Sequence, residues 1–586
     1  MIYLPNAGKV RLIIMRFLDW EISGFNRNTA VDFCHKGINP LAAVFLASRG
    51  VANIEDAHAI LGIAPAGIFD PFLLADMDKA VSRINDAVKN GERIAVYGDY
   101  DVDGMTSCAL LALWLRSKGA DYEVYIPGRF GEGYGLNITA LDALKQSGIE
   151  LVVTVDCGIT AIEEAQYARS LGLGLVITDH HECRPQLPEA DAVVNPKRLD
   201  CRYPNKALAG VGVAFKLVCA LEGDPGSDEM FRQYGDLVAI GTVADVMQVD
   251  GENRDLIRRG LAIINDKPRP GLFSLLRDTN PERRKVTTTT ISFSLAPRLN
   301  AAGRMGQPDL SVELLLTDDF KEADRLAAEL SRLNTERRSL EVRIYEEVTT
   351  MLPEGGPTGP IILASRGWYQ GVTGIVSAKL AERYRVPSII LSIDDNGICR
   401  GSCRSAGTSG VYDALRSCEE ILENYGGHEM AAGVTIVEGN LDELRRRITD
   451  FYQDNQKTAL KPELRLDFEV EKPELLTVKN VEALERLEPF GNGYPPPSLC
   501  IKGALVVSAY PIGAGQHMRF RIDKSGRPLD CIFFSMTSEE LGVTEGMIVD
   551  LAFEPQINEF RGRVSVQLHL LDIRPIIQQE PGPGVS

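Results

Sequence analysis

Three short apolar runs, each ending in side chains that can bind metal, constrain the fold of this chain more than any other feature. Residues 93–104 read Arg-Ile-Ala-Val-Tyr-Gly-Asp-Tyr-Asp-Val-Asp-Gly, so aspartates at alternate positions follow an apolar run. Residues 150–158 and 174–181 repeat this design. Such runs are typical of buried parallel strands, whose carboxyl ends meet at one edge of a sheet. We therefore expect the polar residues after the three runs to converge.

These converging residues have the chemistry of a metal site. They are Asp99, Asp101 and Asp103 after the first run, Asp156 after the second, and Asp179, His180 and His181 after the third. Carboxylates this close together repel one another, so they either face water or bind hard divalent cations. A single Asp after a strand is usually a helix N-cap, and acidic turns are common. The two histidines add nitrogen ligands that suit Mn, Fe or Zn, and together the motifs favour a metal site.

At this point the sequence resembles a known superfamily. The triplet Asp179-His180-His181, together with residues 98–104, resembles the signature of the DHH phosphoesterases. Within that superfamily, residues 40–576 are similar to the RecJ family of single-strand-specific DNA exonucleases. The resemblance implies a metal-dependent enzyme that degrades single-stranded DNA from the 5′ end to mononucleotides, in DNA recombination and repair. It also implies two divalent cations, Mn²⁺ or Mg²⁺.

The resemblance implies roles for individual residues. The expected metal ligands are Asp99, Asp101, Asp103, Asp156, His180 and Asp245. We assign Asp156 as the bridge between the two ions, and Asp99 and His181 are alternatively groups close beside them. The expected catalytic residues are Asp101, Asp103, Asp156, His180, His181 and His428. Tyr97 stands where some relatives have histidine, which bears on the coordination of the first metal.

Substrate contacts are expected from several loops. The candidates are Arg129, Tyr134, Arg304, Ser402, Arg404 and His428. Arg129 and Tyr134 belong to the glycine-rich segment 127–135, which resembles the loop of the family that meets phosphate and base. We expect Arg298 and Arg304 to flank a turn, and since arginine suits bidentate phosphate contact, Arg304 is the better candidate for the DNA backbone. Ser402 and Arg404, with glycine backbone beside them, can form an anion site.

Two further candidates depend on their surroundings. Asp245 lies in the largely apolar segment 235–249, which we expect to be a helix, and a carboxylate buried there would need a partner. Asp236 in the same segment is expected to act as a cap or to support a ligand. His428 lies in a Gly-Gly-His segment that resembles the DHHA1 domain of the superfamily. On its own it would more often be a core or capping histidine.

Composition bounds the class of protein. The chain has 586 residues, 44% hydrophobic and 25% charged, as in ordinary globular proteins. Its net charge of −18 argues against a nucleic-acid partner only weakly, because a basic groove can be local. The eleven cysteines show no CxxC pair, which fits a reducing compartment. Without a membrane-spanning run or a signal peptide, a cytoplasmic location is expected.

The pattern of elements predicts a multidomain α/β protein. The periodic apolar residues between Thr317 and Leu352 predict one long helix, interrupted in its stripe at Arg337. The short β runs after residue 456 fit an OB-like barrel, which grips single strands. The expected domains are 1–75 (N-terminal helical segment), 76–275 (DHH parallel-sheet catalytic domain), 276–352 (connector with the long helix), 353–455 (DHHA1-like substrate domain), 456–578 (OB fold) and 579–586 (disordered tail).

Two other functions remain open from sequence. A phosphodiesterase acting on small molecules or oligonucleotides could use the same metal site, although the C-terminal β domain argues against it. A catalytically inactive scaffold is the second alternative, and the filled metal motifs argue against that. The expected partners are single-stranded DNA, a single-strand-binding protein and a helicase, with no membrane.

Overall fold

The computed structural model describes most of the chain. It covers residues 2–4, 11–13, 17, 19–63, 67–128, 135–282, 284–407, 410–455, 463–513, 515–537 and 541–576. Arg129, Tyr134 and the expected tail 579–586 lie outside these ranges. The chain divides into two compact units, Gly67–Leu460 and Met1–Ala66 with Lys461–Ser586. In the part that the structure describes, no helix is long and apolar enough to cross a membrane.

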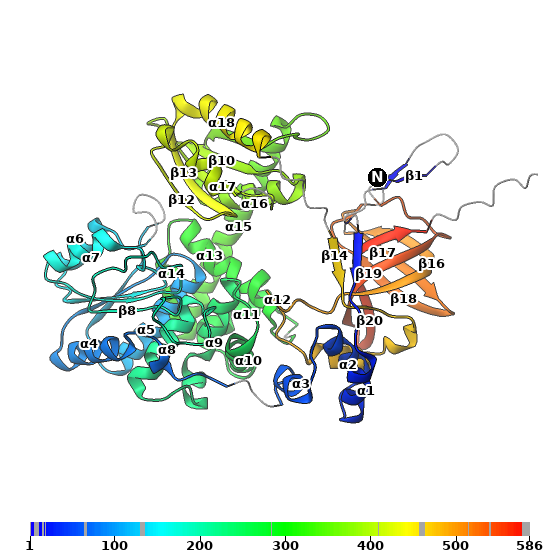
Figure 1. Ribbon diagram of the computed structural model, residues 1–586, viewed down its shortest axis with the longest axis horizontal. Coiled ribbons are helices and arrows are strands. Elements are labelled where there is room, and N and C mark those ends of the chain that lie inside the picture. The colour runs from blue at the N-terminus through cyan, green and yellow to red at the C-terminus, as the bar shows by residue number, and fades with distance from the viewer. Residues whose placement is uncertain are drawn as a thin grey trace, which may run out of the picture. The chain divides into compact units, whose positions relative to one another are not determined.

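The first sheet of the larger unit is fully parallel, as the apolar runs predicted. In spatial order its strands are β5 (Tyr122–Tyr125), β4 (Ile94–Tyr97), β6 (Leu151–Val155), β7 (Gly174–Thr178) and β8 (Ala192–Val194). The helices are α4 (Met77–Asn90), α5 (Val102–Ser117), α6 (Ile138–Gln146), α7 (Ile162–Ser170) and α8 (Gly210–Glu222). Helices α6 and α7 cover one face, and α4, α5 and α8 cover the other (Figure 1).

A helical region follows the sheet. It comprises α9 (Asp228–Ala244), α10 (Gly251–Asp266), α11 (Pro270–Thr279), α12 (Thr288–Thr290), the π-helix η2 (Ile291–Leu295), α13 (Ala296–Arg304) and α14 (Asp309–Leu316). The short 3₁₀ helix η1 (Pro71–Leu73) precedes the sheet. Helix α9 packs against both α5 and α10. This packing brings the carboxyl end of α9 to the carboxyl edge of the sheet.

The predicted long helix is α15 (Phe320–Met351), which at 32 residues is about 48 Å long. Its amino-terminal half packs against α11, α13 and α14, and its carboxyl-terminal half enters the core of the next domain. The gap in its apolar stripe is filled by a buried ion pair, since Arg337 donates to Glu341 at 2.6 Å. One helix therefore belongs to the cores of two neighbouring domains.

The second sheet is mixed. Its strands, in spatial order, are β12 (Asn424–Gly427), β13 (Ala431–Val437), β11 (Ile398–Arg404), β10 (Ser388–Ile393) and β9 (Ile361–Arg366). Helix α16 (Gln370–Tyr384) packs with α15 on one face. The other face is covered by α17 (Val411–Arg416) and α18 (Leu441–Asp454), with the short turns η3 (Glu419–Ile421) and η4 (Glu438–Asn440) beside them.

The smaller unit contains a closed barrel, as expected for the C-terminal region. The ring runs β16 (Leu499–Ile512), β17 (His517–Lys524), β18 (Arg527–Phe533), β20 (Arg563–Pro575) and β19 (Ile548–Phe560), and β19 pairs back with β16. The remaining elements are β1 (Ile2–Leu4), β2 (Arg11–Ile13), β3 (Asp19–Ile22), α1 (Arg27–His35), α2 (Pro40–Ser48), α3 (Ile54–Ile60), β14 (Glu463–Leu466), β15 (Phe468–Glu469), η5 (Pro473–Leu475) and α19 (Val478–Glu485). The N-terminal helices share one apolar core with the barrel.

Candidate metal centre

The acidic residues after β4 and β6 lie at the point in the first sheet where the order of the strands along the chain reverses. From β4 the chain runs outward to β5 and then returns to form β6 on the other side of β4. Open α/β sheets bind ligands in the crevice at such a point. Asp99, Asp101 and Asp103 follow β4, and Asp156 follows β6 directly. The topology therefore brings the predicted residues of two strands to one crevice.

Asp103 is held by the amino-terminal end of another helix. It is buried in the first turn of α5. The backbone N–H of Gly210 donates to its Oδ2 at 2.6 Å, and that of Val211 donates to its Oδ1 at 2.8 Å. Both amides come from the first turn of α8, where the helix dipole favours negative charge. Each carboxylate oxygen keeps a lone pair for a further partner.

Asp156 is fixed in a backbone conformation that few residues adopt. Its φ is 62°, in the left-handed region, and its side chain is buried. Gly210 lies so close that a Cβ at that position would be 2.5 Å from Asp156 Oδ1. Backbone strain persists only where the surroundings impose it, and it clusters at functional sites. The close approach of α8 therefore requires glycine at position 210.

His180 faces three carboxylates. Its Nε2 lies 3.1 Å from Asp156 Oδ1, 3.5 Å from Asp245 Oδ2 and 3.9 Å from Asp103 Oδ2. Burial lowers the pKa of His180 to about 3, and the charge of His181 contributes to the shift. The imidazole is therefore neutral at physiological pH. It is in the form that binds metal, and it brings no positive charge to its acidic neighbours.

The carboxylates of this cluster are close to one another and largely buried. Burial raises the pKa of Asp103 and of Asp156 well above the ordinary value, and neighbouring carboxylates raise both further. Burial also raises the pKa of Asp245 to about 7, with the charge of Asp101 as the next cause. These shifts are those of carboxylates whose negative charges are close together and out of water. A bound cation would reverse them.

Unsatisfied atoms in the cluster fit a cation. Asp156 Oδ1, His180 Nε2 and Asp245 Oδ2 are buried and make no hydrogen bond within the described residues. Buried polar atoms nearly always have a partner. Ligand atoms about 2.1 Å from an octahedral cation lie about 3 Å from one another, and two of the separations here are 3.1 and 3.5 Å. A set of carboxylates with one imidazole suits Mn²⁺, and the carboxylates suit Mg²⁺.

The candidate ligands form three groups, and within each group the ligand atoms lie within 4.8 Å of one another. Their members are Asp99, Asp101 and Asp156 in one, Asp103, His180 and Asp245 in another, and Asp156, Asp179, His180 and His181 in a third. Asp156 and His180 each belong to two groups. The predicted metal ligands therefore lie together in the structure.

Asp179 orients His181. Its Oδ2 accepts from the Ile159 N–H at 2.9 Å, and its Oδ1 lies 2.7 Å from His181 Nδ1. Burial opposes ionisation of Asp179, but the hydrogen bond and charge of His181 lower its pKa. Burial likewise opposes protonation of His181, yet Asp179 raises the pKa of His181 to about 9. The pair is an ion pair at the edge of the cluster.

The helix expected over 235–249 has different limits. Helix α9 begins earlier, at Asp228, and ends at Ala244, so Asp245 is its C-cap rather than an interior residue. Val246 then takes a φ of 56°, which directs the chain away from the helix axis. Asp236 does not reach the cluster, because both of its carboxylate oxygens accept from Arg269 at 2.6 Å.

The second domain brings Ser402 and Arg404 together. Both lie on β11, and a Cβ on Gly374 of α16 would be 3.0 Å from Ser402 Oγ and 3.3 Å from Arg404 Nη2. Glycine at position 374 therefore leaves the space in front of these two side chains open. His428 is exposed in the turn between β12 and β13, where its backbone exchanges hydrogen bonds with Ala431.

The turn expected between Arg298 and Arg304 is wrong, because both residues belong to α13 and the chain between them is helical. Arg304 ends α13, and its Nη1 donates to the carbonyl of Gly371 at 3.3 Å. Gly371 is in the first turn of α16. Arg304 therefore lies between the helical region and the second domain.

Tyr97 is directed away from the cluster. Its hydroxyl donates to the carbonyl of Gly135 at 2.9 Å and accepts from Asn137 Nδ2 at 3.1 Å, and its ring stacks on Tyr125. The sequence did not reveal the roles of Gly210 and Val211. A Gly-Val-Gly run opening a helix was the available signal, but it carries no acidic or basic side chain.

Comparisons with known proteins agree with this arrangement. Residues 93–242 match the DHH family, N-terminal domain, residues 358–454 match the DHHA1 domain, and residues 466–572 match the RecJ OB domain. The chain is 39% identical over 559 residues to "Single-stranded-DNA-specific exonuclease RecJ" of Bacillus subtilis (strain 168), which covers 94% of this chain and 70% of that relative.

Two crystal structures of RecJ from Thermus thermophilus are similar throughout. The complex with Mn²⁺ has a TM-score of 0.80 at 29% identity, over 97% of this chain and 81% of the other. The complex with Mg²⁺ has a TM-score of 0.75 at 28% identity, over 97% and 80%. Both structures contain a divalent cation, and this chain has clusters of suitable ligands. With relatives this similar over nearly its whole length, the chain belongs to the RecJ family of exonucleases.

Proposed function

We propose that this protein is a metal-dependent exonuclease that hydrolyses single-stranded DNA from the 5′ end to mononucleotides. Membership of the RecJ family supports the exonuclease activity and the single-stranded substrate. The observation that carries the metal dependence is the buried cluster in which Asp156 Oδ1, His180 Nε2 and Asp245 Oδ2 have no hydrogen bond within the described residues. The proposal includes a role in DNA recombination and repair and a cytoplasmic location.

Two divalent cations, Mn²⁺ or Mg²⁺, would be held by two of the three groups of candidate ligands. Asp99, Asp101 and Asp156 can bind one, and Asp103, His180 and Asp245 can bind the other with Asp156 as the bridge. When bound, such ions lower the pKa of a water and stabilise charge on the oxygens of the phosphodiester. The 3.1 Å distance from Asp156 Oδ1 to Nε2 of His180, a member of the other group, supports this bridging role.

The surrounding residues fix the ligands and position the phosphate. The amides of Gly210 and Val211 orient the Asp103 carboxylate. Asp179 holds His181 in its protonated form, so His181 presents a positive charge at the half-exposed edge of the cluster. That charge can attract the scissile phosphate and can donate a proton to the leaving oxygen.

Polarity requires recognition of a strand end, because a phosphodiester looks alike to two cations from either direction. Ser402 and Arg404 flank the space left by Gly374, and with Arg129 they can surround a 5′-phosphate. His428, from the same domain, is a further candidate for the scissile phosphate. Arg304 lies where the two domains meet and is our candidate for the DNA backbone.

The barrel supports action on a polymer rather than on a small phosphodiester. Its match to the RecJ OB domain favours a role in gripping single strands. A phosphodiesterase limited to small molecules would have no use for such a domain, and the filled ligand groups argue against an inactive scaffold. A single-strand-binding protein and a helicase are the proposed protein partners.

Product analysis tests the function directly. With Mn²⁺ or Mg²⁺, a single strand labelled at its 5′ end should release labelled mononucleotide first, and one labelled at its 3′ end should release its label last. Neither strand should be cleaved when a chelator is present. Release from the 3′ end, or products longer than one nucleotide, would contradict the proposal. A duplex of the same sequence is the control for strand specificity.

A second measurement tests end recognition. Matched strands with 5′-phosphate or 5′-hydroxyl should differ in kcat/KM for the wild type, and Arg404→Ala should erode that preference more than it slows cleavage of the 5′-hydroxyl strand. A wild type indifferent to the phosphate, or a variant that keeps the full preference, would remove Arg404 from this role.

A further inference from the structure

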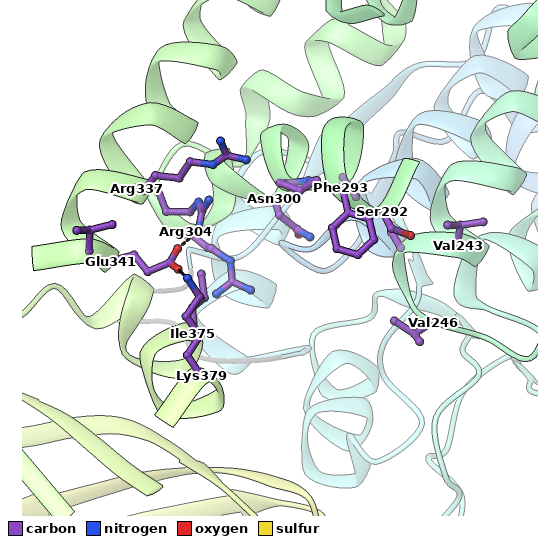
Figure 2. Close-up of a pocket in the computed structure, with 15 residues that line it drawn as sticks. Val243, Val246, Ser292, Phe293, Asn300, Arg304, Arg337, Glu341, Ile375 and Lys379 are labelled. Carbon is purple, nitrogen blue, oxygen red and sulfur yellow. Dashed lines mark hydrogen bonds and ion pairs between the residues drawn. The ribbon is translucent and has the colours of Figure 1, made fainter. Parts of the chain in front are cut away.

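A cavity of about 610 Å³ lies next to the metal centre (Figure 2). Val243, Ala244 and Val246 line it, and Asp245 is the candidate metal ligand in the middle of this run. The other walls come from η2, α13, α15 and α16. The volume falls within the range of about 300–1,000 Å³ that is usual for small-molecule sites. None of the candidate metal ligands lines this cavity, so its chemistry is separate from theirs.

One wall presents an exposed aromatic ring. Phe293 lies in the π-helix η2 and is 72% exposed. Pro297 has no N–H, so it cannot donate the helical hydrogen bond to the carbonyl of Phe293. The N–H of Ala296 donates to the carbonyl of Ile291, five residues back rather than the four of an α-helix. Val246, 63% exposed, lines the same cavity in its left-handed conformation. Two exposed apolar side chains therefore line the same cavity.

The opposite wall is cationic. In Figure 2, Arg304, Arg337, Glu341 and Lys379 lie on one side of the cavity, and Phe293 and Val246 lie on the other. Glu341 is paired with both Arg337 and Lys379. Arg338 also lines the cavity and is exposed, and no carboxylate of the described residues forms an ion pair with it. The lining therefore carries an excess of positive charge.

We propose that this cavity binds one nucleotide unit of the substrate strand, adjoining the unit at the metal centre. Its base stacks on Phe293 and its phosphate meets Arg338. An aromatic face combined with a cation is how proteins bind single strands without reading their sequence. A base paired within a duplex cannot reach the ring without being unstacked, so this site would contribute to the preference for single strands. The inference rests on the proposed function.

Substitution of the ring tests the stacking. Base stacking on an aromatic side chain is strong enough that Phe293→Ala should raise KM for a single-stranded oligonucleotide about 10-fold or more. Phe293→Trp should keep KM near the wild-type value, because tryptophan also stacks. Phe72→Ala is the matched control, since Phe72 is 51% exposed and lies on η1, away from the cavity. Thermal unfolding of each variant checks that the fold is kept.

A scan of the substrate locates the base. Strands with a single abasic nucleotide at successive positions from the 5′ end should show one position at which the wild type loses affinity by about the same factor as Phe293→Ala. At that position the two changes should not add, because each removes the same contact. Additive effects at all positions, or an unchanged KM for Phe293→Ala, would overturn the proposal.

Salt dependence tests the phosphate contact. Arg338→Ala should reduce the slope of log affinity against log salt by about 0.7, the value for one phosphate contact to a single strand, and Arg338→Lys should restore it. An unchanged slope would remove Arg338 from the strand.

The results distinguish failure of this inference from failure of the proposed function. A wild type that does not degrade single strands would contradict the proposed function, whereas a wild type that does so with normal KM in Phe293→Ala would contradict the cavity assignment alone. A third probe is free deoxyadenosine monophosphate. If Phe293→Ala weakens its binding but leaves the KM of the strand unchanged, the cavity binds a free nucleotide and the strand assignment is wrong.

Discussion

Two buried clusters of charged residues lie in the same unit and differ in how their charges are balanced. Lys216 and Glu252 are both fully buried and pair at 2.7 Å. Phe69 supplies a carbonyl to Lys216, and the hydroxyl of Tyr203 donates to Glu252, both at 2.8 Å. The second is the metal cluster, which consists of the candidate metal ligands. There the imidazole of His180, which faces Asp103, Asp156 and Asp245, is neutral.

The contrast teaches that burial of charge alone does not mark a functional site. Burial lowers the pKa of Lys216 while Glu252 opposes the shift, so the ion pair contains its own counter-charge. The metal cluster contains carboxylates whose pKa values are raised and atoms that make no hydrogen bond in the described part of the chain. The first cluster is complete as a structural unit, whereas the second has the ligands for a cation from solution, as we propose. Substitutions should therefore act in opposite ways on the two.

The largest effect is expected at the metal cluster. Asp156→Asn should lower kcat by on the order of 10³-fold or more, because a catalytic group that serves both ions cannot be replaced by a neutral amide. Asparagine tolerates the left-handed backbone of position 156, so the fold should be kept. Unfolding of the metal-free variant should occur at a temperature equal to or above that of the wild type. Substantial turnover at saturating Mn²⁺ would contradict the bridging assignment.

The ion pair should respond in stability rather than in chemistry. Glu252→Gln leaves Lys216 buried without a counter-charge, which typically costs about 3–5 kcal/mol in the free energy of unfolding. Denaturant titration measures this cost, and activity per folded molecule should be near normal. A matched variant, Glu252→Gln with Lys216→Met, should recover part of the loss because it also removes the unpaired ammonium. A single variant as stable as the wild type would mean that the pair is not a structural unit.

Metal addition sharpens the comparison with a smaller effect. A cation at 100 times its dissociation constant stabilises the folded state by about 2.7 kcal/mol. Mn²⁺ should therefore raise the unfolding temperature of the wild type and of Glu252→Gln alike, but should raise that of Asp156→Asn much less. An equal rise in all three proteins would place the bound ion outside the cluster.

The smallest effect is expected at exposed ion pairs. Arg446 pairs with Glu443 and Asp450 on α18, and its side chain is 60% exposed. Surface pairs of this kind contribute about 0.2–1 kcal/mol. Arg446→Ala should therefore change the free energy of unfolding by less than about 1 kcal/mol, and a loss as large as that of Glu252→Gln would mean that exposure does not separate the two kinds of pair.

Local patterns made much of this predictable. The apolar runs before Asp99, Asp156 and Asp179 identified parallel strands, because strand residues buried on both faces must be continuously apolar. The steps of three and four along Phe320–Met351 identified the long helix for the same kind of reason. The acidic residues and histidines at the strand ends are recognisable as candidate metal ligands, because few other arrangements can hold carboxylates so close together.

Other features depended on contacts between distant segments. Asp245 was recognised through family resemblance, but its position at the end of α9 follows from how α9 packs against α5. The backbone amides that donate to Asp103 belong to Gly210 and Val211, which lie 107 and 108 positions further along the chain. The joining of N-terminal helices to the barrel spans more than 400 residues, as in the hydrogen bond from Asn39 to Asn480. Phe293 was not singled out, because an aromatic residue in an apolar segment usually lies in a core.

The sequence by itself determined which residues could bind metal, since carboxylates and imidazoles after apolar strands are a local chemical pattern. The tertiary structure decided which of them lie close enough to share an ion, which histidine is neutral and which is charged, and which charged clusters contain their own counter-charge. The physical reason is that ionisation and hydrogen bonding depend on burial and on neighbours within a few ångströms. Those neighbours are brought together by packing between strands and helices that lie far apart in the chain.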